Sequence, residues 1–186
     1  MFSTEQLIAD CRAALAETSP DQAVKEIVKR AVSRPAEVER ALGVPQKGEI
    51  VPLYRSETLT ILNVIWAPGM SIYPHDHRMW AVIGLYGGRE DNHFYRRVPN
   101  SIEQASVRQL ETGDTVLLGA PTIHSVTNPL DRLTGAIHIY GGDFFAVPRS
   151  EFDPQTLEER PYDVEKAKRL FLEANDRVRT ASRAAT

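Results

Sequence analysis

Cysteine is almost absent from the chain, because Cys11 is the only one among 186 residues. A lone cysteine cannot form a disulfide within the chain, which excludes a disulfide-stabilised secreted scaffold and suits a reducing compartment. No apolar run reaches membrane-spanning length, and no basic stretch followed by an apolar one begins the chain. We therefore expect a cytoplasmic protein with no membrane partner.

An excess of positive charge is also missing, since 22 Lys and Arg stand against 25 Asp and Glu. The resulting net charge of -3 gives no electrostatic reason to expect nucleic acid as a partner. The sequence shows no internal repeat and no low-complexity segment. Its length suits one domain with a sizeable core, so we expect a single domain over 1–186.

The pattern of apolar residues divides this domain into three parts. Residues 1–47 have helical spacing, and a helix is expected to begin at Ser19-Pro20 with Ser19 as its cap. Residues 48–149 change to short strands punctuated by Gly and Pro turns, which favours a β-sandwich or barrel. The predicted strands are 50–54, 59–66, 81–86, 93–97, 106–110, 115–118, 124–127 and 133–140. Residues 150–186 are expected to form a C-terminal helical segment whose helix is capped by Asp163.

The most informative motif is a pair of histidines, His75 and His77, at the start of an apolar run. Residues two apart in a strand point to the same face, so both imidazoles can aim at one point while Asp76 points away. A third histidine, His124, opens a later predicted strand. Neutral imidazole is a common ligand of transition metals, so these three are the candidate metal ligands. The alternative is a surface pair beside a turn.

Together these motifs resemble those of the cupin family of double-stranded β-helix barrels. The first cupin motif is a glycine, five residues and His-x-His, and it matches 69–77. The second is a glycine, five residues, Pro-x-Gly, two residues, His, three residues and Asn. It matches 113–128, with Gly119 and Pro121 in exchanged order. The resemblance implies a mainly β fold, a cupin double-stranded β-helix barrel with N-terminal helices and a C-terminal helix.

The carboxylate that most metal cupins carry shortly after the second histidine is missing, because Ala81-Val82 stands there. Three neutral ligands would leave a divalent ion its full charge and favour anionic ligands in the open positions. A structural zinc site would usually have four protein ligands, so an open three-histidine site favours catalysis. Glu90 or Asp91 could still supply a fourth ligand, against the alternative that both lie in a solvated turn.

Within the cupins, the pattern resembles the thiol dioxygenases, the group of cysteine dioxygenase and 3-mercaptopropionate dioxygenase. The resemblance covers about 48–149 and rests on 74–77, His124 and 136–140. In that family the last segment reads Ser-x-His-x-Tyr, a hydrogen-bonded relay whose tyrosine reaches the metal pocket. His138 and Tyr140 match this relay and are implied to be catalytic. Ala136 replaces the serine, which breaks the relay at its outer end.

The resemblance also implies an arginine that binds the substrate carboxylate, a task for which the planar guanidinium is suited. Arg55 lies before the first motif, where cysteine-oxidising members carry such an arginine. Arg149 lies nine residues after Tyr140, similar to the place used by mercaptopropionate-type members. The cysteine that crosslinks to the tyrosine in animal members has no counterpart, which narrowly favours Arg149. His93, beside a charged turn, is expected to be a surface residue.

These residues predict a mononuclear non-haem Fe(II) enzyme that oxidises a small thiol carboxylate to a sulfinate. By resemblance, the substrate thiolate and O₂ would both bind iron, and both oxygens would go to sulfur. Alternatives are a carbon–carbon-cleaving dioxygenase, a metal-dependent isomerase, or a non-catalytic small-molecule-binding cupin. The sequence leaves open the identity of the thiol, a homo-oligomeric state, and another divalent transition metal, because imidazole suits several of them.

Overall fold

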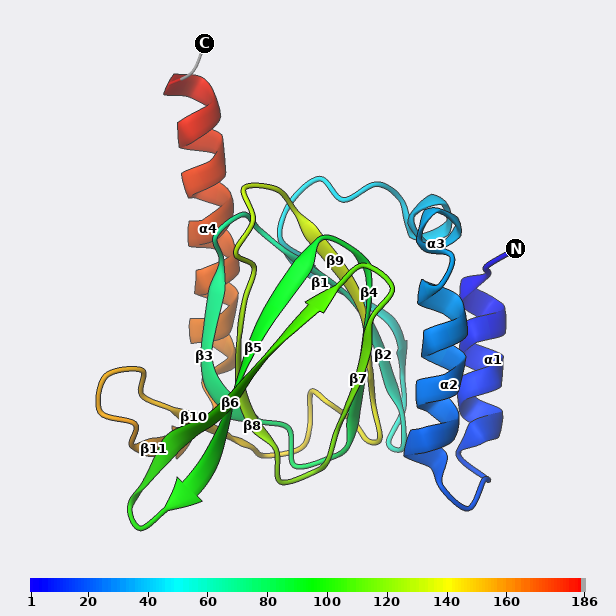
Figure 1. The fold of residues 1–186 in the computed structure, drawn as a ribbon, viewed down its shortest axis with the longest axis horizontal. Coiled ribbons are helices and arrows are strands. Elements are labelled where there is room, and N and C mark those ends of the chain that lie inside the picture. The colour runs from blue at the N-terminus through cyan, green and yellow to red at the C-terminus, as the bar shows by residue number, and fades with distance from the viewer. Residues whose placement is uncertain (185–186) are drawn as a thin grey trace.

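The computed structural model describes residues 1–184, with side chains through residue 181. Two antiparallel sheets face each other, with three helices before them and one long helix after them (Figure 1). The last two residues of the predicted segment 150–186 lie outside the described residues. No helix among the described residues combines the length and apolar content needed to cross a membrane.

The N-terminal helices begin at residues that favour a helix start, namely proline and serine. They are α1 (Thr4–Ala14), α2 (Pro20–Val32) and α3 (Pro35–Leu42). Both α2 and α3 begin with proline, whose missing N–H and fixed φ suit the first helical position. Ser3 caps α1 by accepting a hydrogen bond from the Gln6 backbone N–H at 3.2 Å. Ser19 is the N-cap residue of α2 as expected, but its side chain forms no capping hydrogen bond, and its carbonyl accepts from the Ala23 N–H instead.

The strands form one five-stranded and one six-stranded sheet. The first contains, in spatial order, β1 (Glu49–Arg55), β2 (Thr60–Trp66), β9 (Thr134–Tyr140), β4 (Ala81–Gly87) and β7 (Thr115–Leu118). The second contains β11 (Glu159–Pro161), β10 (Ser150–Phe152), β3 (Ser71–Asp76), β8 (Ile123–Thr127), β5 (Arg89–Val98) and β6 (Ser101–Glu111).

The strand pairing is nested: β5 pairs with β6, β4 with β7, β3 with β8 and β2 with β9. From β2 to β5 the chain alternates between the two sheets. From β6 to β9 it alternates again, and each of these strands pairs with its partner from β5 back to β2. Two antiparallel halves of one ribbon are therefore wound together into a barrel. The fold is a double-stranded β-helix.

Three strands were not predicted from the sequence, namely β3, β10 and β11. The last two lie in the segment 150–186, which was expected to be helical and is helical only from Val164. Strand β3 contains Pro74 and carries Ser71 and Asp76 at its ends, a composition that indicates a turn rather than a strand. Its register with β8 also shifts between Ile72 and His75. Strands β10 and β11 have three residues each, too short for an alternating pattern to be visible.

Both faces of the five-stranded sheet are covered, and every residue of β2 and β9 is buried. Inward-facing residues such as Leu62 and Ile83 join the core between the sheets. Outward-facing residues such as Ile61 and Ile137 pack with residues of α1, α2 and α3 in a second apolar cluster. This double coverage explains why the two strands have continuous apolar sequences rather than alternating ones.

The C-terminal helix α4 (Val164–Ala184) closes the other side of the barrel, beside β3 (Figure 1). Asp163 caps it as expected, since its Oδ1 accepts a hydrogen bond from the Lys166 backbone N–H at 3.0 Å. Phe171 on this helix stacks on Trp66 of β2, with ring centroids 5.6 Å apart. The core between the sheets therefore extends onto the inner face of α4.

Close packing of α2 on β4 makes Gly84 a sensitive position. A Cβ atom at Gly84 would lie 2.3 Å from Cγ1 of Val28 and 3.0 Å from Cγ1 of Val32. We expect Gly84→Ala to lower the free energy of unfolding by about 1–3 kcal/mol, because the helix must shift away from the sheet. Urea unfolding followed by circular dichroism measures this loss.

The matched control is Gly87→Ala in the same strand, where a Cβ atom would meet nothing within 4 Å. We expect its unfolding midpoint to stay close to that of the wild type. Equal unfolding midpoints for Gly84→Ala and the wild type would contradict the packing argument.

Candidate metal centre

The three candidate ligands come from neighbouring parts of one sheet. His75 on β3 lies directly opposite His124 on β8 in the strand register, and His77 follows the last residue of β3. Asp76, between the two histidines, points away from them as expected. It accepts a hydrogen bond from the Ser150 backbone N–H at 2.8 Å and pairs with Arg78 Nε at 2.7 Å. These contacts anchor the end of β3 and hold the flanking imidazoles inward.

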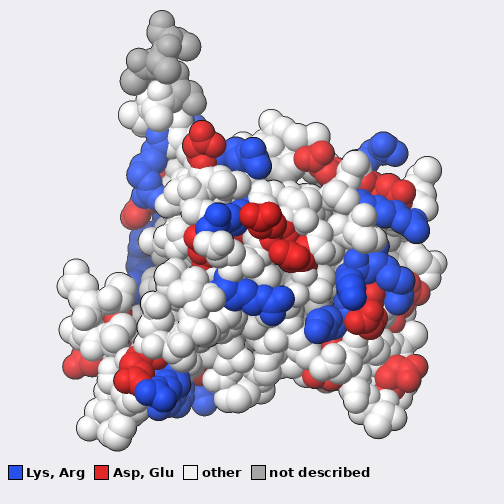
Figure 2. Space-filling model, in the orientation of Figure 1, with Lys and Arg blue, Asp and Glu red and all other residues white. Residues whose placement is uncertain are grey.

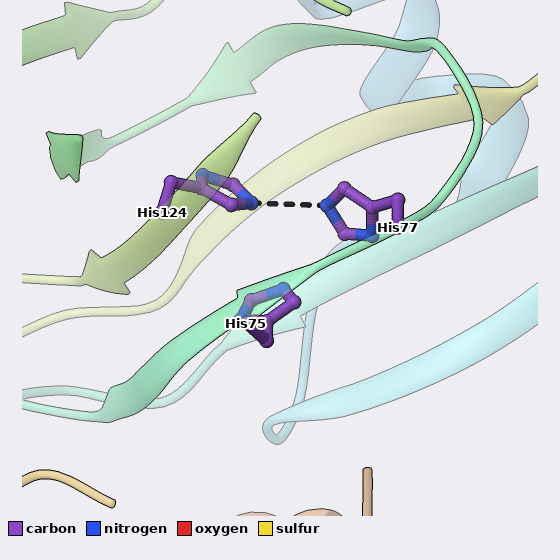
Figure 3. A group of neighbouring side chains, drawn as sticks. All are labelled: His75, His77 and His124. Carbon is purple, nitrogen blue, oxygen red and sulfur yellow. Dashed lines mark hydrogen bonds between the residues drawn. The ribbon is translucent and has the colours of Figure 1, made fainter. Parts of the chain in front are cut away.

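The three imidazoles converge on one point inside the barrel (Figure 3). Their candidate ligand atoms all lie within 4.8 Å of one another. The side chains are almost fully enclosed, with residue exposures of 6% for His75, 3% for His77 and 1% for His124. The surface-pair alternative is therefore wrong.

Hydrogen bonds at the outer ring nitrogens orient two of the imidazoles. Nδ1 of His75 lies 3.0 Å from the carbonyl oxygen of Tyr73, and Nδ1 of His124 lies 2.9 Å from Oδ1 of Asn92. Both oxygens can only accept, so each Nδ1 carries the proton and each Nε2 presents its lone pair to the centre. Such outer partners fix the ring tautomer of metal-binding histidines.

Burial keeps these histidines neutral. It lowers the pKa of His75 to about 4 and lowers the pKa of His77 and His124 well below the usual range. For His77 the neighbouring imidazoles of His75 and His124 lower the pKa further. Neutral imidazole is the form that binds a metal ion.

The donor set fits a divalent transition metal. Nε2 of His77 lies only 3.0 Å from Nε2 of His124, and Nδ1 of His77 is a buried atom without a hydrogen-bond partner in the described part of the chain. Two nitrogens each bound at about 2.1 Å to one ion, at a right angle, would be about 3 Å apart. The three histidines could therefore hold such an ion and leave its remaining positions open.

Neither acidic candidate for a fourth ligand joins this cluster. Asp91 pairs with Arg89, whose Nε lies 2.7 Å from its carboxylate. Glu90 is not among the grouped ligand atoms, yet the solvated turn expected for it is also wrong, because Glu90 is 0% exposed. Among the described residues the only grouped ligands are the three histidines.

The burial and the contacts of Glu90 were not predicted from the sequence. Its Oε1 accepts a hydrogen bond from Trp66 Nε1 at 2.7 Å, and its Oε2 lies 3.4 Å from Nδ2 of Asn92. Asn92 in turn accepts the hydrogen bond from His124 described above. A carboxylate next to a glycine turn gives no sequence signal of burial. The one available signal was strand alternation, which places Glu90 and Asn92 on the same face of β5.

His138 and Tyr140 lie inside the barrel next to the histidine cluster. Nδ1 of His138 is 3.0 Å from the Tyr140 hydroxyl, and the Tyr140 ring centroid is 5.0 Å from that of His77. Burial raises the pKa of Tyr140 far above its usual value, so its hydroxyl keeps its proton at neutral pH. Ala136, at the position of the family serine, is fully buried and offers no polar side-chain atom.

Arg149 lies at the edge of the same site. Its guanidinium carbon is 4.1 Å from the ring centroids of both Phe144 and Tyr162, so the group is held between two aromatic faces. Those rings also approach the candidate ligands, with centroid distances of 6.0 Å from Phe144 to His77 and 5.8 Å from Tyr162 to His75. The Nε atom of Arg149 is buried without a hydrogen-bond partner in the described residues.

A cleft of about 590 Å³ reaches Arg149 from the surface. Its lining includes Arg78, Glu159 and Arg160. Arg78 and Arg160 are each paired with carboxylates. The guanidinium of Arg149 instead lies against two aromatic faces, donates to the Phe144 carbonyl oxygen and forms a side-chain hydrogen bond with Tyr162. Of these three arginines, Arg149 is the one without a carboxylate partner among the described residues.

The other sequence candidates lie elsewhere. Arg55 is exposed and forms two 2.9 Å hydrogen bonds with the carboxylate of Asp143. His93 lies outside the histidine cluster, with its Nδ1 3.1 Å from Oε1 of Gln104. The structure therefore brings together the three histidines, His138, Tyr140 and Arg149, and leaves Arg55 and His93 apart from them.

No known protein-family model matches the sequence. The chain is similar to solved structures, including an RmlC-like cupin family protein from Methanocaldococcus jannaschii with a double-stranded β-helix fold. That similarity has 10% sequence identity and a TM-score of 0.47, over 55% of this chain and 86% of the other. With the strand order described above, the chain has the cupin double-stranded β-helix fold predicted from the sequence.

Two further similar structures are enzymes. Oxalate decarboxylase from Bacillus subtilis, described with Mn(II) centres, is 15% identical with a TM-score of 0.39, over 47% of this chain and 22% of its own. A structure from a description of DMSP lyases is 21% identical with a TM-score of 0.41, over 51% of this chain and 44% of its own. This chain spans under half the length of either.

Replacing one candidate ligand should abolish stable metal binding. We expect His124→Ala to lose most of its bound divalent metal, because two imidazoles remain of three. Elemental analysis after dialysis measures the metal content. His93→Ala, which removes an imidazole outside the cluster, should keep wild-type metal content. Full loading of His124→Ala would rule out the three-histidine site.

Proposed function

We propose that the protein is a mononuclear non-haem iron dioxygenase that oxidises a small thiol carboxylate to a sulfinate. The observation that carries the proposal is the convergence of three kinds of group at one buried site. Neutral histidines, a protonated tyrosine and an arginine held between aromatic rings surround the same space. This combination suits a substrate with one end bound at a metal and an anionic other end.

His75, His77 and His124 would hold the ion, and their neutrality matters for the substrate. Because no protein carboxylate joins the cluster, an Fe(II) ion would keep its double positive charge and favour anionic ligands. Bound there, Fe(II) supplies the redox chemistry through which O₂ can react with a thiolate. Other divalent transition metals suit imidazole as well, so the identity of the ion is part of the proposal.

Arg149 would bind the carboxylate of the substrate. Stacking against Phe144 and Tyr162 fixes the plane of the guanidinium, so little freedom is lost when a carboxylate binds. Burial is the main reason why the pKa of His75 and His77 is low, and the positive charge of Arg149 lowers both pKa values further, which supports electrostatic coupling between Arg149 and the metal site. A thiol acid with a short chain could therefore reach both groups at once.

Tyr140 would hydrogen-bond the oxygen or the substrate beside the ion, with His138 supporting it. Its hydroxyl is already held by Nδ1 of His138 at 3.0 Å, which fixes its position before substrate arrives. The barrel interior excludes bulk water from these groups, since His77, His124 and Tyr140 are nearly inaccessible. The reaction needs no further reductant, because both oxygen atoms end on sulfur and sulfur supplies the electrons.

The test is oxygen consumption by the Fe(II)-loaded protein with a panel of small thiol acids, diketones and acids without a thiol. We expect O₂ uptake with at least one thiol acid, matched one to one by sulfinate formed, as measured by mass spectrometry. Turnover of a diketone would instead favour a carbon–carbon-cleaving dioxygenase. Conversion of an acid into another product without O₂ uptake would favour an isomerase or lyase. Binding of an acid without any conversion would favour a non-catalytic cupin.

Arg149→Ala should discriminate between substrates that carry a carboxylate and those that lack it. An arginine–carboxylate contact is worth about 1.5–3 kcal/mol, so kcat/KM for the thiol acid should fall roughly 10- to 100-fold. The loss should vanish for an uncharged analogue of the same thiol. Steady-state kinetics of both proteins on both substrates measures this difference.

Arg55→Ala is the matched control, because Arg55 is exposed and paired with Asp143. We expect it to leave both substrates nearly unaffected. If Arg149→Ala loses activity equally on both substrates, Arg149 supports the fold rather than the carboxylate. If only Arg55→Ala lowers kcat/KM for the thiol acid more than for the uncharged analogue, the carboxylate binds at Arg55 instead.

A further inference from the structure

Glu90 is a buried carboxylate whose surroundings call for an explanation. It is 0% exposed, and no lysine or arginine pairs with it among the described residues. Burying a carboxylate is costly unless hydrogen bonds or a charged partner compensate. The partners that it does have are Trp66, Asn92 and His138.

His138 has a complementary unmet requirement. Its Nδ1 is engaged by the Tyr140 hydroxyl, but its Nε2 is buried and has no hydrogen-bond partner in the described part of the chain. The nearest ionisable group is Glu90, whose Oε1 lies 3.6 Å from Nε2. An unsatisfied ring nitrogen and a carboxylate that needs compensation therefore face each other inside the barrel.

We propose that Glu90 is a positioning residue that holds the Nε2 proton of His138 and thereby fixes how Tyr140 is presented at the metal centre. This inference rests on the proposed function for its effect on turnover, but the hydrogen-bond arrangement does not. Glu90 replaces, from another strand, the polar group that Ala136 cannot supply on β9. The relay thus runs from Glu90 through His138 to Tyr140.

The chemistry of the carboxylate decides the direction of this relay. Trp66 Nε1 and Asn92 Nδ2 both donate to Glu90, so its oxygens act as acceptors. A carboxylate facing Nε2 favours the tautomer in which Nε2 carries the proton. In a neutral His138 that tautomer makes Nδ1 an acceptor, to which the Tyr140 hydroxyl donates. The tyrosine oxygen is then held in place with both lone pairs free, so Tyr140 acts toward the metal centre as a hydrogen-bond acceptor.

The same carboxylate also reaches a metal ligand. The Asn92 amide uses Nδ2 toward Glu90 and Oδ1 toward Nδ1 of His124, at 3.4 and 2.9 Å. Glu90 therefore orients a candidate ligand on one side and the tyrosine relay on the other. The arm through His138 is the one that the proposal assigns to catalysis, and an experiment can separate the two.

The experiment first uses the wild-type protein loaded with Zn(II), which is diamagnetic. Two-bond ¹H–¹⁵N correlation spectra report which imidazole nitrogen carries the proton, and His138→Gln identifies the signals among five histidines. We expect Nε2 of His138 to be protonated. An unprotonated Nε2 together with a protonated Nδ1 would overturn the proposal. Because this measurement uses the wild-type protein, it does not depend on whether a variant folds.

The second part compares Glu90→Gln with Asp91→Asn, a matched control on the same strand whose carboxylate pairs with Arg89. Glutamine keeps the shape of the side chain, but its amide group can donate a hydrogen bond to Nε2. We expect Glu90→Gln to keep its metal and to change the His138 ¹⁵N signals. For the Fe(II)-loaded protein we expect kcat to fall about 10-fold with KM nearly unchanged. Asp91→Asn should change none of these.

Two results would count against the role of Glu90. Unchanged His138 signals and turnover in Glu90→Gln would make Glu90 a core residue that only satisfies Trp66. Loss of metal with unchanged His138 signals would assign its effect to the Asn92–His124 arm instead. If the wild type oxidises no thiol, the proposed function fails while the His138 spectra still decide whether the relay exists.

Discussion

The register of β3 against β8 is the constraint on which the candidate site depends. It sets His75 directly opposite His124, with both side chains inside the barrel. A slip of one residue would turn one of the two imidazoles outward, because neighbouring strand residues face opposite sides. The contacts of Asp76 with Ser150 and Arg78 on the outer side hold β3 in this register.

Around this register, the interior of the barrel is organised to keep imidazoles neutral and charges in defined places. Burial lowers the pKa of all three clustered histidines, and outer hydrogen bonds aim Nε2 of His75 and His124 at the centre. One anion, Glu90, lies beside His138, and one cation, Arg149, lines the cleft. This placement separates the negative charge of Glu90 from the positive charge of Arg149, with the neutral histidine cluster inside the barrel.

The helices support this interior from outside. The α2 helix packs so closely on β4 that Gly84 has no room for a side chain, and α4 stacks Phe171 on Trp66. Trp66 also donates to Glu90, so one indole contacts the C-terminal helix, the barrel core and the buried carboxylate. The polar groups of the site are thus held by side chains whose own positions are fixed by the apolar core.

The sequence alone determined the elements whose signal is local. Helical spacing before residue 48, strands between turns, and the His-x-His pair with a later histidine predicted the barrel and its three candidate ligands. It failed where the deciding partner is distant along the chain. Strand β3 contains a proline and polar residues and is a strand because β8 pairs with it.

Glu90 follows a glycine turn and is buried because Trp66 and Asn92 satisfy its oxygens. The surroundings of Arg55 and Arg149 were likewise not visible in the sequence, since Asp143 engages one and two aromatic rings hold the other. Spacing along the chain fixes which face a side chain occupies. Burial and partner choice arise only when the nested strands bring distant residues within a few ångströms, because electrostatic and hydrogen-bonding environments belong to the folded interior.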